Sequence, residues 1–390
     1  MAAKIDDLEE GRLASASVKW TTHLLSLFVI AGLTAGVYAT MTGHQIAYGL
    51  SREVPWGILT SSFAFFAITS TGLCLLGAIS HAYGVTPLRP LGSRAVYLAI
   101  VTTVTAFMLL AFSVESPLLF IYYNAASPNL TSNIWWLSTL YGIMSGCLFL
   151  RFAFLVSGSQ GLALTFGIIA AVTAVGANNN LGGLFTLASD PPIWFGIQLL
   201  ILFLASAVLA GTATVIIFTV VAYKLRQQEI VGETHKALET AATLMALMAG
   251  IVLVVTIARF YSIFFSDTPD PGITAARALI NGPLAVNFWC FEILTGLIVP
   301  LVLLLLTKTK SIWAMTLAAC MAMVGAYVQR FDLVFSGQIV PKFSGWNDLP
   351  QYLHYFPSGA ELIVVIGAFS LVGFGFLLGE RFVGKLFRLY

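Results

Sequence analysis

Charged residues are scarce in this sequence. Only 9% of the 390 residues are Asp, Glu, Lys or Arg and 58% are hydrophobic, whereas a soluble domain carries roughly 25% charged residues. A soluble globular protein is therefore excluded. The 19 Lys and Arg nearly balance the 17 Asp and Glu, and no basic tract is long enough to follow a phosphate backbone. We therefore expect no nucleic-acid partner.

Motifs for metal binding and catalysis are also absent from the sequence. The four cysteines lie far apart, each in an apolar run, so they form neither a local disulfide framework nor a zinc site. There is no Ser-His-Asp grouping, His-Glu-x-x-His motif or phosphate-binding loop. We predict no catalytic residue and no metal ion held by the chain alone, so any redox chemistry must use a bound cofactor or a partner.

Long apolar runs recur along the whole chain. A helix needs about 20 apolar residues to cross a hydrocarbon core about 30 Å thick. The runs reach this length, and none alternates like the strands of an outer-membrane barrel, so we predict an all-α integral membrane protein with about ten transmembrane helices. The predicted spans are 20–41, 56–82, 94–114, 132–155, 160–178, 194–224, 237–264, 284–307, 311–334 and 358–379.

The basic residues are distributed unevenly across the predicted membrane domain. Ten crossings place both termini on one side, and fourteen of the nineteen Lys and Arg fall there, including Arg94, Arg151 and Arg226. Basic loops stay cytoplasmic, so we predict cytoplasmic N- and C-termini. Residues 1–18 form the cytoplasmic N-terminal segment, because they are polar and mixed in charge, unlike a cleavable signal peptide.

The loops on the outer side are longer than most inner loops and contain acidic residues such as Glu53. Docking of a partner and simple shielding of the helices explain such loops almost equally well.

A weak internal repeat divides the transmembrane domain, residues 19–390. Pro55-Trp56-Gly57 begins the second predicted helix from the outer side, and Pro192-Ile193-Trp194-Phe195-Gly196 begins the sixth from the same side. Proline in a first helical turn costs no hydrogen bond. The repeat predicts two parallel four-helix bundles, helices 2–5 (56–178) and 6–9 (194–334). Helix 1 with its outer loop (20–55) and helix 10 (358–379) flank the bundles.

Four ionisable residues fall inside predicted helices: Arg259, Glu292, Arg330 and Glu361. An ionised group at helix mid-depth costs about 2.5–3.5 kcal/mol on insertion scales, so it must be paired, hydrated or functional. We favour a polar path that carries protons or holds a polar ligand, with Asp332 as a weaker member. The alternative is a set of structural ion pairs that fix the bundle.

Two further polar features allow a structural and a functional interpretation. The segment Asn178-Asn179-Asn180-Leu181-Gly182-Gly183-Leu184 at the end of helix 5 is typical of a turn, and the sharper interpretation is unwound backbone lining a cavity. His23 and His81 form the one histidine pair within helices on the cytoplasmic side, and neither repeats on its helix as in a dihaem bundle. Haem binding is therefore the less favoured interpretation.

Five segments, in order and spacing, resemble the NrfD/PsrC (polysulfide reductase membrane subunit) family. They are Val54-Pro55-Trp56-Gly57, Arg259-Phe260, Phe288-Trp289-Cys290-Phe291-Glu292, the Arg330 segment, and Tyr355-Phe356-Pro357-Ser358-Gly359-Ala360-Glu361-Leu362. The ten-helix members are the most similar. This resemblance implies a bacterial inner-membrane subunit that binds a quinone, either menaquinone or ubiquinone, without haem or an iron–sulfur cluster of its own. It also implies a ferredoxin-like iron–sulfur partner on the outer face, with further molybdopterin, hydrogenase or multihaem cytochrome subunits.

The resemblance also assigns roles to individual residues. Trp56 and Gly57 match the helix-start motif beside the family's quinone pocket. Arg259, Glu292, Arg330 and Glu361 match buried polar positions that have been proposed to carry protons. Some members have His-Gln at Ala177-Asn178, and some have a histidine just before the Trp-Gly turn, where this chain has Glu53-Val54. His44, Glu53 or Asn178 are then the candidate ligands of the quinone head, because a quinone carbonyl needs a donor and a quinol needs an acceptor.

Our hypothesis from the sequence is a quinone/quinol-binding subunit of a multi-subunit respiratory oxidoreductase, with proton translocation left open. Two alternatives remain at this stage. A secondary transporter also explains buried charges and an internal repeat. A purely structural membrane anchor for outer redox subunits explains the long outer loops.

Overall fold

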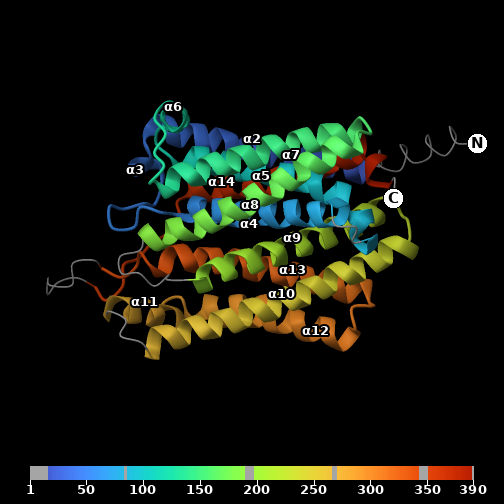
Figure 1. Ribbon diagram of the computed structural model, residues 1–390. Helices are drawn as coiled ribbons and strands as arrows, with labels where there is room; N and C mark the ends of the chain where they lie inside the picture. Colours follow the sequence, from blue (N-terminus) through green and yellow to red (C-terminus); the bar gives the residue numbers. More distant parts are fainter. Residues whose placement is uncertain (1–15, 83–85, 189–196, 266–269, 342–349, 389–390) are drawn as a thin grey trace, which may run out of the picture.

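The computed structural model describes residues 16–82, 86–188, 197–265, 270–341 and 350–388, and within these ranges the chain is helical without any strand (Figure 1). Ten of the described helices are long and apolar enough to cross a membrane, which confirms the prediction of a multi-pass integral membrane protein. The membrane helices are α2 (Ala16–Thr42), α4 (Ile58–Ala82), α5 (Arg89–Ser113), α7 (Asn133–Val156), α8 (Gln160–Ala188), α9 (Ile197–Leu225), α10 (Gly232–Phe265), η2 (Asn287–Ile298) continued by α12 (Val299–Thr307), α13 (Ile312–Ser336) and α14 (Gly359–Phe382).

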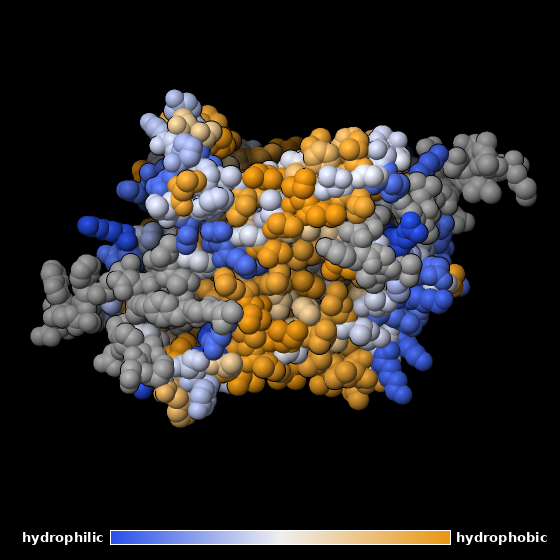
Figure 2. Space-filling view, in the orientation of Figure 1, coloured by the Kyte–Doolittle hydropathy of each residue, from blue (hydrophilic) through white to orange (hydrophobic). Residues whose placement is uncertain are grey.

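The two ends of the membrane domain differ. One end, which we call the loop end, carries the short helices α3 (His44–Ala47), α6 (Pro117–Ala126) and α11 (Asp270–Ile280) (Figure 1). The other, which we call the terminus end, is where α2 begins and α14 ends, and it carries the short turns η1 (Thr86–Leu88) and η3 (Leu386–Arg388). A hydrophobic band separates the two more polar ends in Figure 2.

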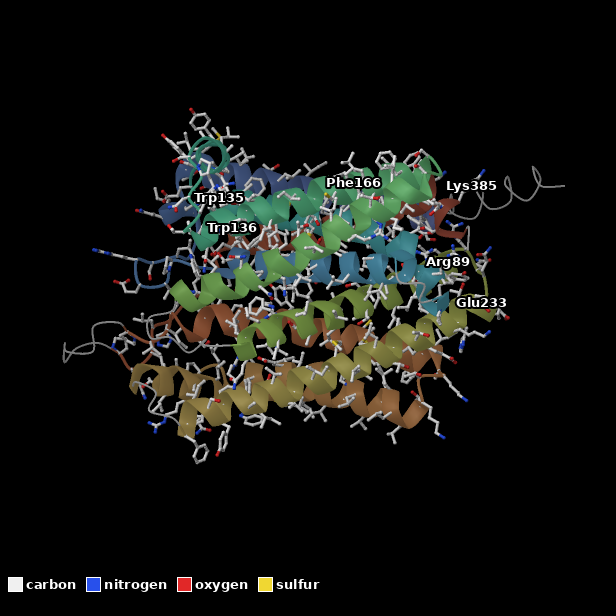
Figure 3. The ribbon with its side chains drawn as sticks, in the orientation of Figure 1. Arg89, Trp135, Trp136, Phe166, Glu233 and Lys385 are labelled. Carbon is white, nitrogen blue, oxygen red and sulfur yellow. The ribbon has the colours of Figure 1, made fainter. Side chains whose placement is uncertain are left out.

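Labelled side chains mark the two ends in Figure 3. Trp135 and Trp136 lie at the loop end, and Arg89, Glu233 and Lys385 lie at the terminus end. Tryptophans at one border and charges at the other are typical of membrane–water interfaces. The assignment of the terminus end to the cytoplasm stays a prediction.

Three pairs of glycines allow helices to cross closely. Gly32 of α2 faces Gly367 of α14, Gly72 of α4 faces Gly211 of α9, and Gly296 of η2 faces Gly325 of α13. A side chain at any of these positions would collide with the opposite backbone. Helices in lipid associate through such close packing, because lipid tails are as apolar as the side chains. The α4–α9 crossing joins the first helices of the two predicted four-helix bundles; the division into two bundles stays a prediction, and residues 192–196 of the repeat lie outside the described ranges.

The segment from Asn178 to Leu184 is helical, so the turn predicted there is wrong. Helix α8 continues through this segment to Ala188. The Asn180 side-chain amide donates to the Gly176 carbonyl at 3.0 Å, which satisfies it within the helix. Gly182 lets Phe203 of α9 approach, since a Cβ there would lie 3.4 Å from the ring. The three amides and two glycines therefore lie within α8 and do not end the helix.

The eighth membrane helix has an irregularity that the hydrophobic pattern does not reveal. Its first part, η2, is a π-helix of 12 residues, and α12 follows with Pro300 in its first turn. Proline lacks an N–H group, so it cannot donate to the carbonyl four residues earlier, and the regular helical bonding is interrupted there. π-Helical turns are frequent at functional sites. Glu292 lies near the middle of η2.

Candidate functional site

Two sequence motifs that are about 300 residues apart meet at the loop end. Glu361, in the first turn of α14, is 1% exposed. Its carboxylate accepts hydrogen bonds from the Gly49 N–H at 2.9 Å, the Ser358 N–H at 2.8 Å and the Tyr355 hydroxyl at 2.6 Å. Ser358 in turn accepts a bond from the Glu361 N–H, which completes a capping box at the start of α14. The helix start thus fixes the carboxylate in place.

The Trp-Gly turn that precedes α4 packs directly on this carboxylate. A Cβ at Gly57 would collide with Glu361 and lie 2.7 Å from the Tyr355 hydroxyl, so only glycine fits. The Tyr355 hydroxyl also accepts a bond from the Ile58 N–H at 2.9 Å. The side-chain oxygen of Gln338 accepts a hydrogen bond from the Trp56 N–H at 2.9 Å, and its amide nitrogen donates to the Trp56 carbonyl at 3.2 Å. We call the group Gly49, Trp56, Gly57, Gln338, Tyr355 and Glu361 the Trp-Gly cluster.

His44 lies beside this cluster, on α3. It is 6% exposed, its ring packs in a tilted arrangement against Tyr48 with centroids 4.8 Å apart, and Tyr48 interacts electrostatically with Glu361. The Nε2 atom of His44 has no hydrogen-bond partner among the described residues. Burial lowers the pKa of His44 below its usual 6.5, partly opposed by the negative charge of Glu115. His44 is therefore a neutral imidazole with a free ring nitrogen at neutral pH.

A second group of buried polar residues lies deeper in the bundle. It comprises Arg259 of α10, Glu292 of η2, and Gln329, Arg330 and Asp332 of α13, which we call the arginine–glutamate cluster. All five are at most 6% exposed. The Gln329 amide donates to the Glu292 carboxylate at 3.0 Å, and Asn287 donates to Asp332 at 3.3 Å. Glu292 interacts electrostatically with both arginines.

Arg330 connects this cluster to the first half of the chain. Its guanidinium donates to the Ser206 hydroxyl of α9 and lies over the Phe203 ring, 4.2 Å from the centroid. It also interacts electrostatically with Tyr141 of α7. The Nε and Nη1 atoms of Arg330 and one carboxylate oxygen of Asp332 have no hydrogen-bond partner among the described residues. The cluster therefore retains unused donors and acceptors among buried residues.

The depth of the arginine–glutamate cluster differs from the mid-depth position assumed from the sequence. Arg259 and Arg330 lie six residues before the loop-end termini of α10 and α13, and Glu292 lies five residues after the start of η2. At 1.5 Å per residue this is about 9 Å from the helix ends. Both polar clusters therefore lie in the half of the membrane domain next to the loop end.

The structure separates the predicted site residues into groups. Glu361, predicted as part of the charged path, is bonded to the Trp-Gly turn, and no hydrogen bond joins it to Arg259, Glu292 or Arg330 in the described part of the chain. Glu53 is exposed to solvent. Asn178 is fully buried on α8, and both of its side-chain amide atoms lack a hydrogen-bond partner among the described residues.

Sequence reasoning missed several residues of both clusters. Tyr355 lies in a segment that carried the family resemblance, but nothing in its pattern distinguished it from neighbouring aromatic residues. Gln338, Gln329, Ser206 and Tyr48 are uncharged polar residues, and such residues give no signal until tertiary packing shows what they contact.

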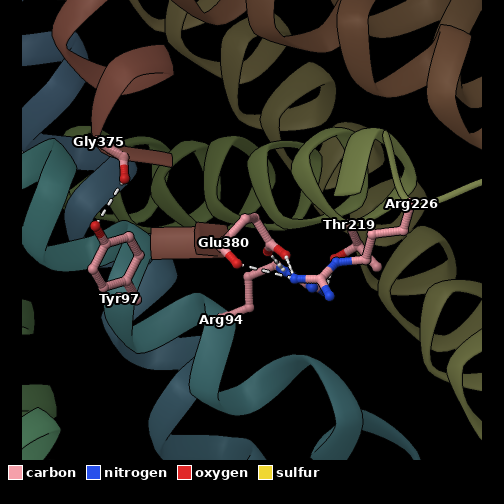
Figure 4. A network of polar contacts seen from close by, with 6 residues as sticks. All are labelled: Arg94, Tyr97, Thr219, Arg226, Gly375 and Glu380. Atoms are coloured by element: carbon pink, nitrogen blue, oxygen red, sulfur yellow. Dashed lines mark hydrogen bonds and ion pairs between the residues drawn. The ribbon is translucent and has the colours of Figure 1, made fainter. Parts of the chain in front are cut away.

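A third polar cluster lies at the terminus end and was also missed (Figure 4). Glu380 of α14 pairs with Arg94 of α5 at 3.0 Å and with Arg226 after α9 at 2.9 Å, and Thr219 contacts Arg94 at 3.3 Å. We call these four residues the Glu380 cluster. Arg94, Arg151 and Arg226, which we counted as basic residues of the membrane surface, are at most 5% exposed. The one signal available in the sequence was an acidic residue, Glu380, near the end of a hydrophobic run.

No group of three or more His, Cys, Asp or Glu residues that could hold a metal ion occurs in the described part of the chain. His23 is exposed on α2, and the side chain of His81 lies outside the described residues. At the loop end, His44, Tyr355, Glu361 and the arginine–glutamate cluster offer groups for hydrogen bonding and proton exchange.

The chain is similar to a protein family and to individual membrane subunits over most of its length. The family model described as "Polysulphide reductase, NrfD" matches residues 46–342, about three quarters of the chain. The Hdr-like menaquinol oxidoreductase integral membrane subunit of Archaeoglobus fulgidus is 23% identical over 382 residues, covering 93% of this chain and 92% of the relative. A selenate reductase subunit of Mesobacillus selenatarsenatis is 22% identical over 395 residues, covering 90% of each. A match of this extent shows that the chain belongs to the NrfD family of polysulphide reductase membrane proteins.

Proposed function

We propose that this chain is the quinone-binding membrane subunit of a multi-subunit respiratory oxidoreductase. In the proposed reaction a quinol loses two electrons and two protons to become a quinone, or the reverse. The electrons pass to or from an iron–sulfur partner subunit docked at the loop end, and the protons pass to or from groups of this chain. Membership of the NrfD family and the names of the two relatives, a menaquinol oxidoreductase subunit and a selenate reductase subunit, support this proposal.

The observation that carries the proposal is the Trp-Gly cluster together with His44. A quinone head needs hydrogen-bond donors for its carbonyls, an acceptor for a quinol proton and an apolar wall. His44 offers an unpartnered, buried Nε2 atom, Trp56 and Tyr48 supply aromatic walls, and Tyr355 and Glu361 supply a fixed hydroxyl and carboxylate. A neutral imidazole can accept a proton at neutral pH, and burial keeps His44 neutral by lowering its pKa.

The arginine–glutamate cluster is the proposed continuation of the proton path. Glu292, Arg259, Arg330 and Asp332 are ionisable groups on three membrane helices, and Gln329 holds the Glu292 carboxylate. Ionisable groups buried in membrane proteins mark proton or substrate paths more often than not. Glu361 stands at the Trp-Gly cluster and therefore at the proposed quinone end of that path.

The test is isolation of the native complex in mild detergent, with optical and iron analysis, followed by titration with a hydroxyquinoline oxide as a quinone analogue. We expect a chain without haem that copurifies with an iron–sulfur protein, and inhibition by the analogue of quinol-dependent reduction of the clusters. A chain that purifies without a redox partner and binds no analogue would overturn the proposal in favour of a transporter. An intact complex that binds no quinone would support a structural anchor.

A pair of tyrosine variants localises the site. Tyr355→Phe removes the hydroxyl that joins Ile58 and Glu361, and Tyr352→Phe changes a partly exposed tyrosine three residues away. We expect Tyr355→Phe to slow quinol-dependent cluster reduction about tenfold, the effect of losing a hydrogen bond to a charged group worth about 1.5 kcal/mol. Tyr352→Phe should leave the rate unchanged. Equal rates in the two variants would remove Tyr355 from the site.

A further inference from the structure

A groove lies between α10 and α12, on the terminus-end side of the arginine–glutamate cluster. It encloses about 580 Å³, within the roughly 300–1,000 Å³ typical of sites for small ligands. Seven residues of α10 between Thr243 and Val255 line it, together with Leu301 and Leu305 of α12, and Thr243 is the one polar side chain among them. Gly250 borders the open space of the groove: a Cβ at this position would have no neighbour within 4 Å.

The length of the groove matches one leaflet of a bilayer. From Thr243 to Val255 the helix rises about 18 Å. Half of a hydrocarbon core about 30 Å thick is roughly 15 Å. An extended acyl chain fills this length, whereas a transmembrane helix of a partner would need contacts along the full thickness. Leu305 lies two residues before the end of α12 at Thr307, so this end of the groove opens at the terminus end.

The mouth of the groove at the terminus end is polar and basic. The Thr243 hydroxyl lies 3.4 Å from the Thr309 hydroxyl, which follows α12. Lys308, in a left-handed conformation with φ of 50°, caps α12 and turns the chain, and both Lys308 and Lys310 are exposed. Neither lysine forms an ion pair with another described residue.

Two acidic residues in the first turns of α10 have polar partners of their own. Glu233 pairs with Lys236 at 3.2 Å, and Glu239 pairs with His235 at 3.2 Å. The positive charges of Lys308 and Lys310 are thus left for another anion. Basic pockets at the ends of membrane helices are known to attract the head groups of anionic lipids.

We infer that the α10/α12 groove binds one anionic phospholipid from the terminus-end leaflet. One acyl chain fills the groove over Gly250, and the phosphate lies between the hydroxyls of Thr243 and Thr309 and the ammonium groups of Lys308 and Lys310. The apolar walls and the basic mouth act on different parts of the same ligand, so the two can be tested separately. The inference rests on neither the Trp-Gly cluster nor the proposed redox role.

The head-group contact is tested by lipid titration. The protein, purified in mild detergent with any subunits that accompany it, is titrated with dioleoyl phosphatidylglycerol or dioleoyl phosphatidylcholine, and bound lipids are counted by native mass spectrometry. We expect one phosphatidylglycerol to bind at least tenfold more tightly than phosphatidylcholine. The double variant Lys308→Gln/Lys310→Gln should weaken phosphatidylglycerol binding roughly thirtyfold, the loss of two lysine–anion attractions, and leave phosphatidylcholine unchanged. Lys19→Gln, an exposed lysine on α2, is the control and should change neither.

The acyl-chain contact is tested by filling the groove. Gly250→Leu places a side chain in the open space and should abolish tight binding of phosphatidylglycerol. Gly142→Leu is the matched control, because Gly142 is exposed on α7 and a Cβ there also meets nothing within 4 Å. Equal binding of the two lipids by the unaltered protein, or full retention of phosphatidylglycerol by Gly250→Leu, would overturn the inference. So would a crosslink from position 250 to a partner helix, or selective retention of a quinone there.

Discussion

The arginine–glutamate cluster and the Glu380 cluster are both charged, both buried and lie in opposite halves of the membrane domain. In the Glu380 cluster each carboxylate oxygen has an arginine partner, at 3.0 and 2.9 Å. In the arginine–glutamate cluster, by contrast, Arg330 and Asp332 keep side-chain atoms that have no hydrogen-bond partner among the described residues. A saturated cluster joins helices, whereas an unsaturated one has capacity left for water or a transferred proton. We therefore expect the degree of saturation, and not buried charge by itself, to separate a structural cluster from one that carries protons.

The largest effect is expected from breaking the saturated cluster. Glu380→Gln removes the carboxylate that pairs with the buried guanidinium groups of Arg94 and Arg226. Removing one partner of a buried pair costs about 3–5 kcal/mol. We expect a correspondingly lower thermal unfolding temperature in detergent and a lower yield from membranes. Glu239→Gln, which removes a partly exposed partner of His235, is the control and should change stability little. An unchanged unfolding temperature in Glu380→Gln would refute the structural role of this cluster.

The next effect concerns turnover. Glu292→Gln keeps a side chain that can still bond Gln329 but removes the exchangeable carboxyl proton. A group that transfers a proton contributes about 10²–10⁴-fold to a rate. We therefore expect quinol turnover, measured as quinol-dependent cluster reduction, to fall about a hundredfold, while the purified complex keeps all its proteins in the usual amounts. Glu233→Gln at the exposed start of α10 is the control. Unchanged turnover would exclude Glu292 from the proton path.

A smaller effect is expected where the Trp-Gly turn meets Glu361. Gly57→Ala forces the new methyl group against Glu361 and the Tyr355 hydroxyl. Overpacking of this kind costs about 1–3 kcal/mol. We expect about tenfold weaker binding of the quinone analogue, because the turn must shift. Gly359→Ala, at a nearby helix start where a Cβ meets nothing within 4 Å, should bind normally. Normal binding by both variants would show that the analogue does not use this turn.

The smallest effect is a pH dependence from His44. Burial lowers its pKa in the folded protein below 6.5, so the unfolded chain takes up a proton more readily as the pH falls. Above pH 6.5 the histidine is neutral in both states, so its titration costs no stability. The free energy of unfolding falls as the pH decreases from 6.5 through the lower pKa of His44 in the folded protein. His44→Gln should flatten this acid-side decline in unfolding temperature between pH 5 and 7.5. His354→Gln, an exposed histidine of the same end, should retain the decline.

Much of the architecture was predictable from the sequence because a membrane span is a local property. About 20 consecutive apolar residues predict a membrane helix wherever they occur in a chain, and the described residues contain ten such helices. Helix ends were less predictable. The Asn178–Gly183 segment looks like a turn, but α8 continues through it: Asn180 bonds to Gly176 within the helix, and Gly182 packs on Phe203 of α9. Arg94 was placed at the membrane surface, yet α5 begins at Arg89 and Glu380 holds Arg94 inside.

The site shows the same division between local and tertiary information. The sequence by itself determined that the chain spans a membrane, that it carries ionisable residues within its spans, and that its motifs follow the order of one family. Only the tertiary structure decided which of those residues act together: Glu361 bonds to the Trp-Gly turn, Glu292 lies with Arg259 and Arg330, and Glu380 pairs with Arg94 and Arg226. The physical reason is that hydrophobic length acts over neighbouring residues, whereas hydrogen bonds and ion pairs depend on distances of about 3 Å between helices far apart in the chain.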